Sequence, residues 1–228
     1  MINYVVASSK DWFQEHPKTR QYSSLNIVEI KTKNELNLEL LEKINPRYIF
    51  FPHWNWKVDS EIFERYECVV FHTAPLPFGR GGSPIQNLIL RNIEKTPVCA
   101  LRMTEILDGG PIYDSIEVTL DGTITEIFSK IAVCVEKLII KICQENIEPK
   151  EQSGTVVTFN RLTYADNELK SEYTIKELYD RIRMVDGEGY KNAYINFGDY
   201  KIDLTDSQIE NNEIVAKIRL YRNENKRC

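Results

Sequence analysis

Two segments of this chain carry side chains whose types could perform acid–base chemistry. The first runs FHTAPLPFGRGGSP over residues 71–84 and holds His72 after an apolar run and Arg80 among glycines. Imidazole titrates near neutral pH and can take a proton from an amine. A guanidinium flanked by glycines can approach and bind an anionic oxygen. Taken alone, the segment is equally compatible with a rigid surface loop that holds a structural histidine.

The second segment reads LRMTEILDGGPIY over residues 101–113 and places Asp108 directly before Gly109 and Gly110. An aspartate before two glycines is most often only a turn residue. The two segments occur in one chain and in this order, and that combination favours a shared site over two unrelated loops.

The first two thirds of the chain predict the elements that must position these side chains. Short β-branched or aromatic runs predict strands at 3–7, 25–30, 47–51, 68–72 and 98–103, and apolar periodicity predicts helices at 35–44 and 85–91. Strands that alternate with helices indicate βαβ units and a mostly parallel sheet, which binds ligands beyond the carboxyl ends of its strands. His72 falls at such an end.

A longer helix and a small tail follow. Thr123 and Glu126 have the spacing of a capping box, and the apolar stripe after them predicts a helix packed on the sheet. The polar stretch 146–155 indicates a linker. A helix at 174–185 and strands at 193–197 and 200–204 are expected in the tail. We therefore predict a catalytic domain over 1–150 and, over 151–228, a linker with a small C-terminal helix and hairpin subdomain.

Composition narrows the function classes. The formal net charge is −5 and the pI is about 5.4, which argues against extended nucleic acid as a partner. The cysteines are scattered without a C-x-x-C pair, so neither a metal site nor a disulfide framework is expected. The N-terminus does not resemble a signal peptide and no apolar run approaches a membrane span, which predicts a cytoplasmic protein without membrane contact.

The combined motifs resemble those of the formyltetrahydrofolate-dependent formyltransferases. The shared signature is a histidine followed by Leu-Pro, Arg-Gly and a proline, and then a later Asp-x-Gly-Pro. Here it reads His72, Leu76-Pro77, Arg80-Gly81, Ser83-Pro84 and Asp108-Gly109-Gly110-Pro111. The resemblance covers residues 47–145, and the wording GRGGSP with the short tail looks closest to the sugar N-formyltransferases of the pseudaminic-acid type. It implies an α/β, Rossmann-like formyltransferase fold with a mostly parallel central sheet and a short C-terminal α+β appendage.

The resemblance also implies catalytic roles. His72 would act as the general base, and Asp108 would either stabilise the resulting imidazolium or pass its proton to the departing folate nitrogen. The family's third catalytic residue is an asparagine two positions before the histidine, where this chain has Val70. Asn55 could supply the missing amide from a neighbouring loop, or it is only a turn residue between Trp54 and Trp56.

Binding residues follow from the same resemblance. The cofactor is expected to be 10-formyltetrahydrofolate, with its pterin held by Phe51, Trp54, Leu101, Arg102, Met103 and Leu107. Substrate contacts are expected from Arg80, Gly81, Gly82, Ser83 and Gln86. Weaker similarity adds Asn160, Arg161 and residues 186–190.

The resemblance implies an N-formyltransferase that acts on the primary amine of a nucleotide-linked amino sugar in glycan biosynthesis. The alternatives are a formyltransferase for methionyl-tRNA or glycinamide ribonucleotide, and a non-catalytic folate- or nucleotide-binding module. The expected partner is a small nucleotide sugar. Isolated apolar residues in the tail leave two alternatives, a homodimer patch or packing on the main domain.

Overall fold

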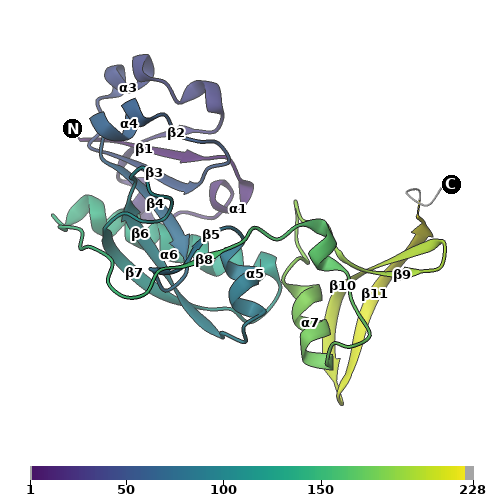
Figure 1. Ribbon diagram of the computed structural model, residues 1–228. Helices are drawn as coiled ribbons and strands as arrows, with labels where there is room; N and C mark the ends of the chain where they lie inside the picture. The colour runs from purple at the N-terminus through teal and green to yellow at the C-terminus, as the bar shows by residue number, and fades with distance from the viewer. Residues whose placement is uncertain (1, 224–228) are drawn as a thin grey trace.

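A six-stranded sheet forms the centre of the larger part of the molecule (Figure 1). The computed structural model describes residues 2–223, so residue 1 and residues 224–228 of the two predicted domains lie outside the described part. The strand order is β2-β1-β3-β4-β6-β7. Its members are β1 (Asn3–Ser8), β2 (Asn26–Ile30), β3 (Tyr48–His53), β4 (Cys68–Thr73), β6 (Lys95–Arg102) and β7 (Ile112–Thr119).

The sheet is mostly parallel, as the sequence predicts. Strands β2, β1, β3 and β4 run parallel, whereas β6 pairs antiparallel with β4 and β7 pairs antiparallel with β6. Strand β7 was not predicted, because its exposed and half-buried side chains hide the apolar alternation on which such a prediction depends. The five predicted strands are confirmed, with ends that differ by a few residues.

Helices cover both faces of this sheet. Helix α6 (Ile124–Gln144) packs its apolar stripe on one face, and its predicted capping box between Thr123 and Glu126 is present. Helices α3 (Leu38–Ile44) and α4 (Ser60–Arg65) cover a smaller apolar cluster on the opposite face. The remaining helical turns are short: α1 (Asp11–Gln14), α2 (Arg20–Ser23), η1 (Lys33–Glu35) and α5 (Pro84–Ile89). Each face therefore has its own core.

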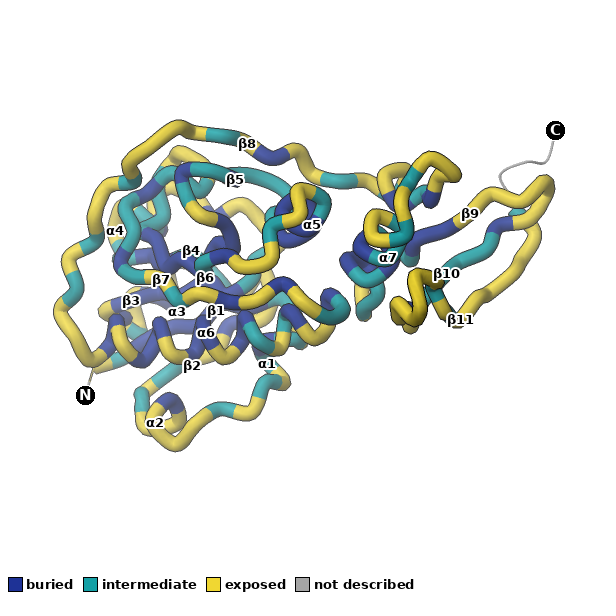
Figure 2. Tube along the Cα trace, turned by 90° about the horizontal axis from the view of Figure 1, so that it is seen from below, coloured by how far each residue is buried: buried dark blue, intermediate teal, exposed yellow. Residues whose placement is uncertain are grey.

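The segment that joins this part to the tail lies against the main domain. We call residues 150–161 the strap. Its short strand β8 (Val157–Phe159) pairs in parallel with β5 (Phe78–Gly81), which lies in the loop after His72. Figure 2 shows this segment crossing the main domain before it reaches the appendage. The polar composition that predicts a linker here conceals a strand that contributes to the main domain.

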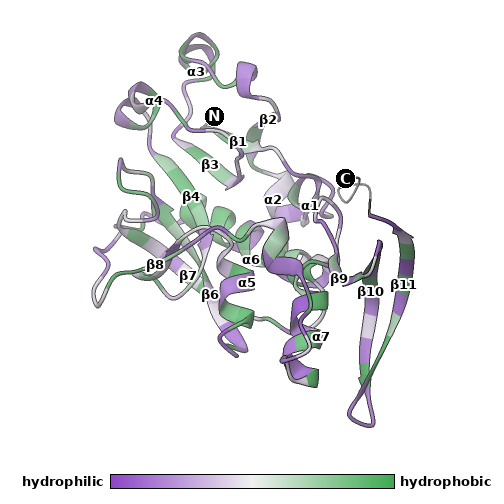
Figure 3. Cartoon of the chain, turned by 45° about the vertical axis from the view of Figure 1, so that its right-hand side comes forward, coloured by the Kyte–Doolittle hydropathy of each residue, from purple (hydrophilic) through white to green (hydrophobic). Residues whose placement is uncertain are grey.

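The tail forms a separate three-stranded antiparallel sheet with the order β11-β10-β9. Its elements are η2 (Tyr164–Asn167), α7 (Ile175–Arg183), β9 (Ala193–Phe197), β10 (Tyr200–Glu210) and β11 (Glu213–Arg222). Strand β11 was not predicted. Its side chains are almost all exposed, including Ile218 and Leu220, although apolar and polar residues alternate along it (Figure 3). The homodimer stays a prediction.

Within residues 2–223, no helix combines the length and the apolar character needed to cross a membrane. The same residues hold no cluster of three or more histidine, cysteine, aspartate or glutamate side chains with the proximity to bind a metal ion.

Candidate active site

His72 and Asp108, the two residues on which the sequence prediction depends, lie together. Atom Nδ1 of His72 is 3.4 Å from Oδ2 of Asp108. Both side chains are largely buried, with exposures of 7% and 14%. Strand β4 carries the histidine near its carboxyl end, and the loop between β6 and β7, which leaves the sheet beside the start of β4, folds back to bring the aspartate against it.

The backbone fixes which ring nitrogen of His72 is available as a base. Atom Nε2 lies 2.8 Å from the carbonyl oxygen of Gly79. A carbonyl can only accept a hydrogen bond, so the proton of the neutral imidazole is on Nε2. The lone pair is then on Nδ1, on the side of Asp108. The neutral ring is thus oriented to take a proton on Nδ1.

Asp108 is held in place by its own loop and by the loop after His72. Its backbone has φ of 51°, a left-handed conformation that aspartate tolerates better than most residues. Its Oδ2 accepts a hydrogen bond of 2.9 Å from the backbone N–H of Gly81. Gly110 is required two positions later, because an added Cβ would lie 1.9 Å from the carbonyl oxygen of Arg102.

An apolar row crosses the sheet beside the histidine. Val70 is in register with Phe51 on β3 and with Leu101 on β6, one row from His72. Trp54 and Met103 pack on the same cluster from the strand ends. Four of the six predicted cofactor residues therefore come together around the valine that replaces the family's asparagine.

The structure places the other two predicted cofactor residues elsewhere. Arg102 points away from this row, where its Nε lies 2.6 Å from a carboxylate oxygen of Glu67. Leu107 is 71% exposed at the tip of the Asp108 loop. Neither side chain lines the apolar row.

Asn55 lies at the same edge of the sheet, near the ends of β1 and β3. Its backbone N–H donates to Oγ of Ser9 at 3.2 Å. Burial is the main cause that lowers the pKa of His53, and the positive charge of Lys10 lowers this pKa further. A hydrogen bond with the side chain of Asn55 acts in the opposite direction and raises it. The hydrogen bonds found for Asn55 among the described residues thus join it to Ser9 and His53, not to the His72–Asp108 pair.

A cavity of about 330 Å³ opens between the main domain and the appendage. Two predicted substrate residues, Ser83 and Gln86, line it at the start of α5, and Gly189 and Tyr190 line it from the tail. The residues that the sequence reasoning missed are Leu162, Thr163, Tyr164, Asn167, Val185 and Lys191. They occupy irregular segments whose approach to α5 follows from the tertiary fold, so no motif announces them.

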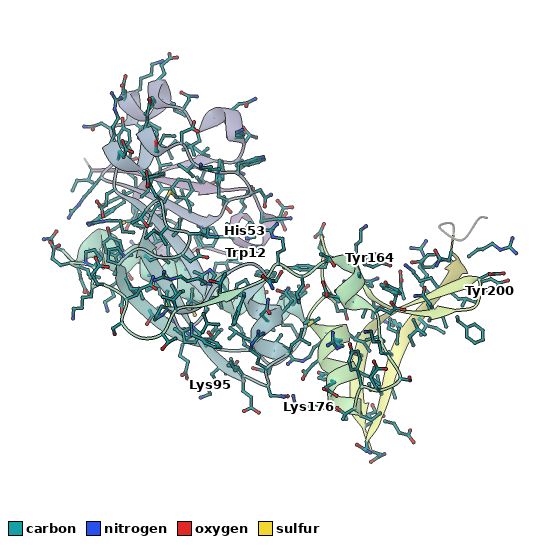
Figure 4. All side chains as sticks on the ribbon, in the orientation of Figure 1. Trp12, His53, Lys95, Tyr164, Lys176 and Tyr200 are labelled. Atoms are coloured by element: carbon teal, nitrogen blue, oxygen red, sulfur yellow. The ribbon has the colours of Figure 1, made fainter. Side chains whose placement is uncertain are left out.

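Three cations that form no ion pair with the described part of the chain surround this cavity. Arg161 packs its backbone on Gly82, and Lys10 reaches towards Gly189. None of Lys10, Arg161 and Lys191 belongs to an ion pair formed within residues 2–223. Figure 4 shows Tyr164 at this junction, whereas His53 and Trp12 lie on the main domain. The cavity can therefore take a polar ligand that carries negative charge.

Arg80 makes internal contacts instead of pointing freely into the cavity. Its Nε and Nη2 donate to the side-chain oxygen of Gln152, at 3.1 and 2.7 Å. Gln152 belongs to the strap and was not among the predicted site residues. Its role could be found only from contacts between distant segments.

The layered sheet, the histidine–aspartate pair at its edge and the antiparallel appendage together define the α/β formyltransferase fold. A solved methionyl-tRNA formyltransferase from Clostridium thermocellum is similar over 98% of this chain and 100% of its own, with a TM-score of 0.92 and 35% identity. A family model described as the C-terminal domain of methionyl-tRNA formyltransferase matches residues 164–221. The chain belongs to the formyltransferase family.

Curated relatives and more distant structures agree with this assignment. A methionyl-tRNA formyltransferase of Sulfurihydrogenibium sp. is 30% identical over 79% of this chain and 60% of the relative. The chain spans half to three fifths of the length of the curated relatives that it matches first. HypX from Aquifex aeolicus in complex with tetrahydrofolic acid (15% identity, 90% of this chain and 37% of HypX, TM-score 0.72) shares the fold. A likely sugar N-formyltransferase from Mycobacterium tuberculosis does so too (14%, 87% and 93%, 0.67).

Proposed function

We propose that this chain transfers a formyl group from 10-formyltetrahydrofolate to a primary amine. The observation that carries the proposal is the 3.4 Å approach of Asp108 Oδ2 to Nδ1 of His72, which lies near the carboxyl end of β4. Bound 10-formyltetrahydrofolate supplies an activated formyl carbon, which bonds to the acceptor nitrogen as the bond to the folate nitrogen breaks.

His72 moves the proton in this proposal. The attacking amine must lose a proton, and Nδ1 of His72 accepts it because Nε2 is already held by Gly79. The carboxylate of Asp108 stabilises the imidazolium that forms. The same Nδ1 then returns the proton to the leaving nitrogen, so that His72 ends neutral.

The third role in the transfer is that of a hydrogen-bond donor to the oxyanion. Val70 has no hydrogen-bond donor in its side chain, so the amide has to come from elsewhere. We assign this role to Asn55, which lies at the same edge of the sheet and is exposed. Loss of one such donor typically costs about 100- to 1,000-fold in rate.

The apolar row fits the flat pterin of the folate. Phe51 and Leu101 are buried beneath it, with exposures of 2% and 1%, so the half-buried Val70, Trp54 and Met103 supply the surface that would contact the ring. Burial of an aromatic ring on such a surface provides binding without a charge.

The acceptor that the similarities favour is methionyl-tRNA, one of the alternatives that the sequence leaves open. Methionyl-tRNA formyltransferases match this chain at 30–35% identity, whereas the likely sugar N-formyltransferase from Mycobacterium tuberculosis matches at 14%. A nucleotide-linked amino sugar remains the second candidate, supported by the net charge of −5 and by a cavity of 330 Å³.

A transfer assay with matched acceptors tests the proposal. Purified protein is given 10-formyltetrahydrofolate with methionyl-tRNA, glycinamide ribonucleotide or a panel of amino-sugar nucleotides, and products are identified by mass. We expect formylmethionyl-tRNA at a kcat/KM at least 100-fold above that for any sugar nucleotide. Preference for a sugar nucleotide would reverse the choice of acceptor, and absence of transfer to every acceptor would overturn the proposed activity.

A further inference from the structure

The strap is bonded to both loops that hold the catalytic pair. On one side of Gln152, Lys150 and Ile112 exchange two backbone hydrogen bonds of 2.7 and 2.8 Å, just after Gly110 and Pro111. On the other side, the N–H of Val157 donates to Pro77 and the N–H of Gly82 donates to Phe159. Gln152 is therefore held between the Asp108 loop and the loop that follows His72.

The side-chain amide of Gln152 both donates and accepts hydrogen bonds. Its Nε2 donates to the carbonyl oxygens of Asp108 and Gly110, both at 2.8 Å. Its Oε1 accepts from Nε and Nη2 of Arg80. The amide thus links the backbone on either side of Gly109 to a guanidinium on β5.

We propose that Gln152 is a positioning residue that sets Asp108 against His72. This inference rests on the proposed function, because it assigns the residue through the proposed catalytic pair. Asp108 cannot keep its carboxylate beside Nδ1 unless its backbone is fixed, and the loop before it is exposed at Ile106 and Leu107. The two bonds from Gln152 fix that backbone.

The geometry also changes the role given to Arg80. A guanidinium that makes two bonds to Gln152 holds the amide with its N–H groups facing the Asp108 loop. Arg80 and Gln152 therefore act on Asp108 in series. Removal of either partner should release the same loop.

Two substitutions of Gln152 separate the role of its N–H donors, which bond to the Asp108 loop, from the role of its oxygen, which accepts from Arg80. Gln152→Glu keeps the shape and the acceptor for Arg80 but removes both donors to the loop. Gln152→Met removes all four hydrogen bonds with a side chain of similar length.

We expect each variant to lower kcat by about 10- to 100-fold, because a displacement of about 1 Å in a catalytic geometry has such an effect. The KM for folate should stay within about twofold, since the apolar row is untouched. The exposed neighbour Glu151, changed to Gln, is the matched control and should leave kcat unchanged.

A readout that needs no acceptor follows the Gly81 amide, which bonds to Asp108. Arg80-Gly81 is the single Arg-Gly pair in the sequence, so ¹³C-arginine with ¹⁵N-glycine labelling isolates its NMR signal. Asp108→Asn gives the signal of the weakened bond. Both Gln152 variants should move the signal towards that position, whereas Glu151→Gln should not. Thermal unfolding, measured in parallel, identifies any variant that fails to fold. If Gln152→Met does not fold, the test uses the isosteric Gln152→Glu variant alone.

The outcomes decide between the two proposals. A shifted Gly81 signal together with a reduced kcat supports the positioning role. An unmoved signal, with or without a loss of kcat, overturns it, and so does a shifted signal with unchanged kcat. If the wild-type protein transfers formyl to none of the acceptors, a shifted signal leaves Gln152 as the residue that holds Asp108, and only the proposed function fails.

A double-mutant cycle tests whether Arg80 and Gln152 act in series. Arg80→Met combined with Gln152→Met should lower kcat no more than the worse single variant. A loss equal to the product of the two single losses would show independent action and would contradict the series arrangement.

Discussion

At the scale of single residues, His72 and Asp108 contribute differently to the rate of formyl transfer. His72 accepts the proton, and Asp108 stabilises the charge that results. His72→Asn should lower kcat by about 100- to 10,000-fold, because it removes the proton acceptor. Asp108→Asn should cost less, about 100-fold, because the base remains but its charged form loses a carboxylate. Single-turnover formyl transfer measures both. His16→Asn, on the α1–α2 side of the molecule, is the control; an equal loss there would contradict the assignment.

The second residue-scale prediction concerns pH. Burial lowers the pKa of His53, with a further contribution from the nearby Lys10. The unfolded chain then binds a proton at a higher pH than the folded one, so this contribution to stability is complete above about pH 6.5 and is lost as the pH falls below it. His53→Gln should flatten the fall in unfolding free energy between pH 7 and 5. Urea unfolding at each pH measures it; parallel curves for both proteins would refute the prediction.

The sequence could predict the two residues that form the pair but not the groups that hold them. His72 and Asp108 belong to a spaced motif, so their residue types and order carry the information. Gln152, Gly79 and the tautomer of His72 depend on which segments meet in space. The same limit explains Arg102: it alternates with the residues of the apolar row, and the direction of a side chain is fixed only by the strand register.

At the scale of elements, the loop between β6 and β7 depends on one glycine. Gly110→Ala should place a methyl group against the carbonyl of Arg102 and displace Asp108. We expect a loss of about 1–3 kcal/mol in unfolding free energy together with a fall in kcat. Chemical denaturation and the transfer assay measure the two effects. Glu105→Ala, exposed in the same loop, is the control, and an unchanged kcat in Gly110→Ala would count against this account.

Continuous apolar runs made the central strands predictable, whereas the short strands β5 and β8 contain no such run. Strands β1, β3 and β4 read as continuous apolar runs because both of their faces are covered. Strands β5 and β8 are short, and they form where Phe159 packs beside Gly79. Their pairing joins residues about 80 positions apart, beyond the reach of any local pattern.

At the scale of the whole molecule, the acidic balance and the proposed tRNA acceptor make a joint prediction. Binding should depend on the few cations around the cavity, so Lys10→Glu and Lys191→Glu should each weaken binding to initiator methionyl-tRNA. With about three phosphates neutralised, the logarithm of the binding constant should fall with the logarithm of salt concentration with a slope near −3. Gel shifts at several salt concentrations measure both. Lys95→Glu, far from the cavity in Figure 4, is the control. A slope near zero would argue against tRNA.

The pairing of β5 with β8 has a consequence for biosynthesis. All six strands of the main sheet have been translated by residue 119, and the helix α6 by residue 144, before any of the strap has been made. The loop after His72 therefore lacks its partner strand while the earlier residues leave the ribosome. This loop reaches its final conformation only when Phe159 is in place, so a chain truncated after residue 144 should fold its sheet and still leave Asp108 without the hydrogen bonds from Gln152.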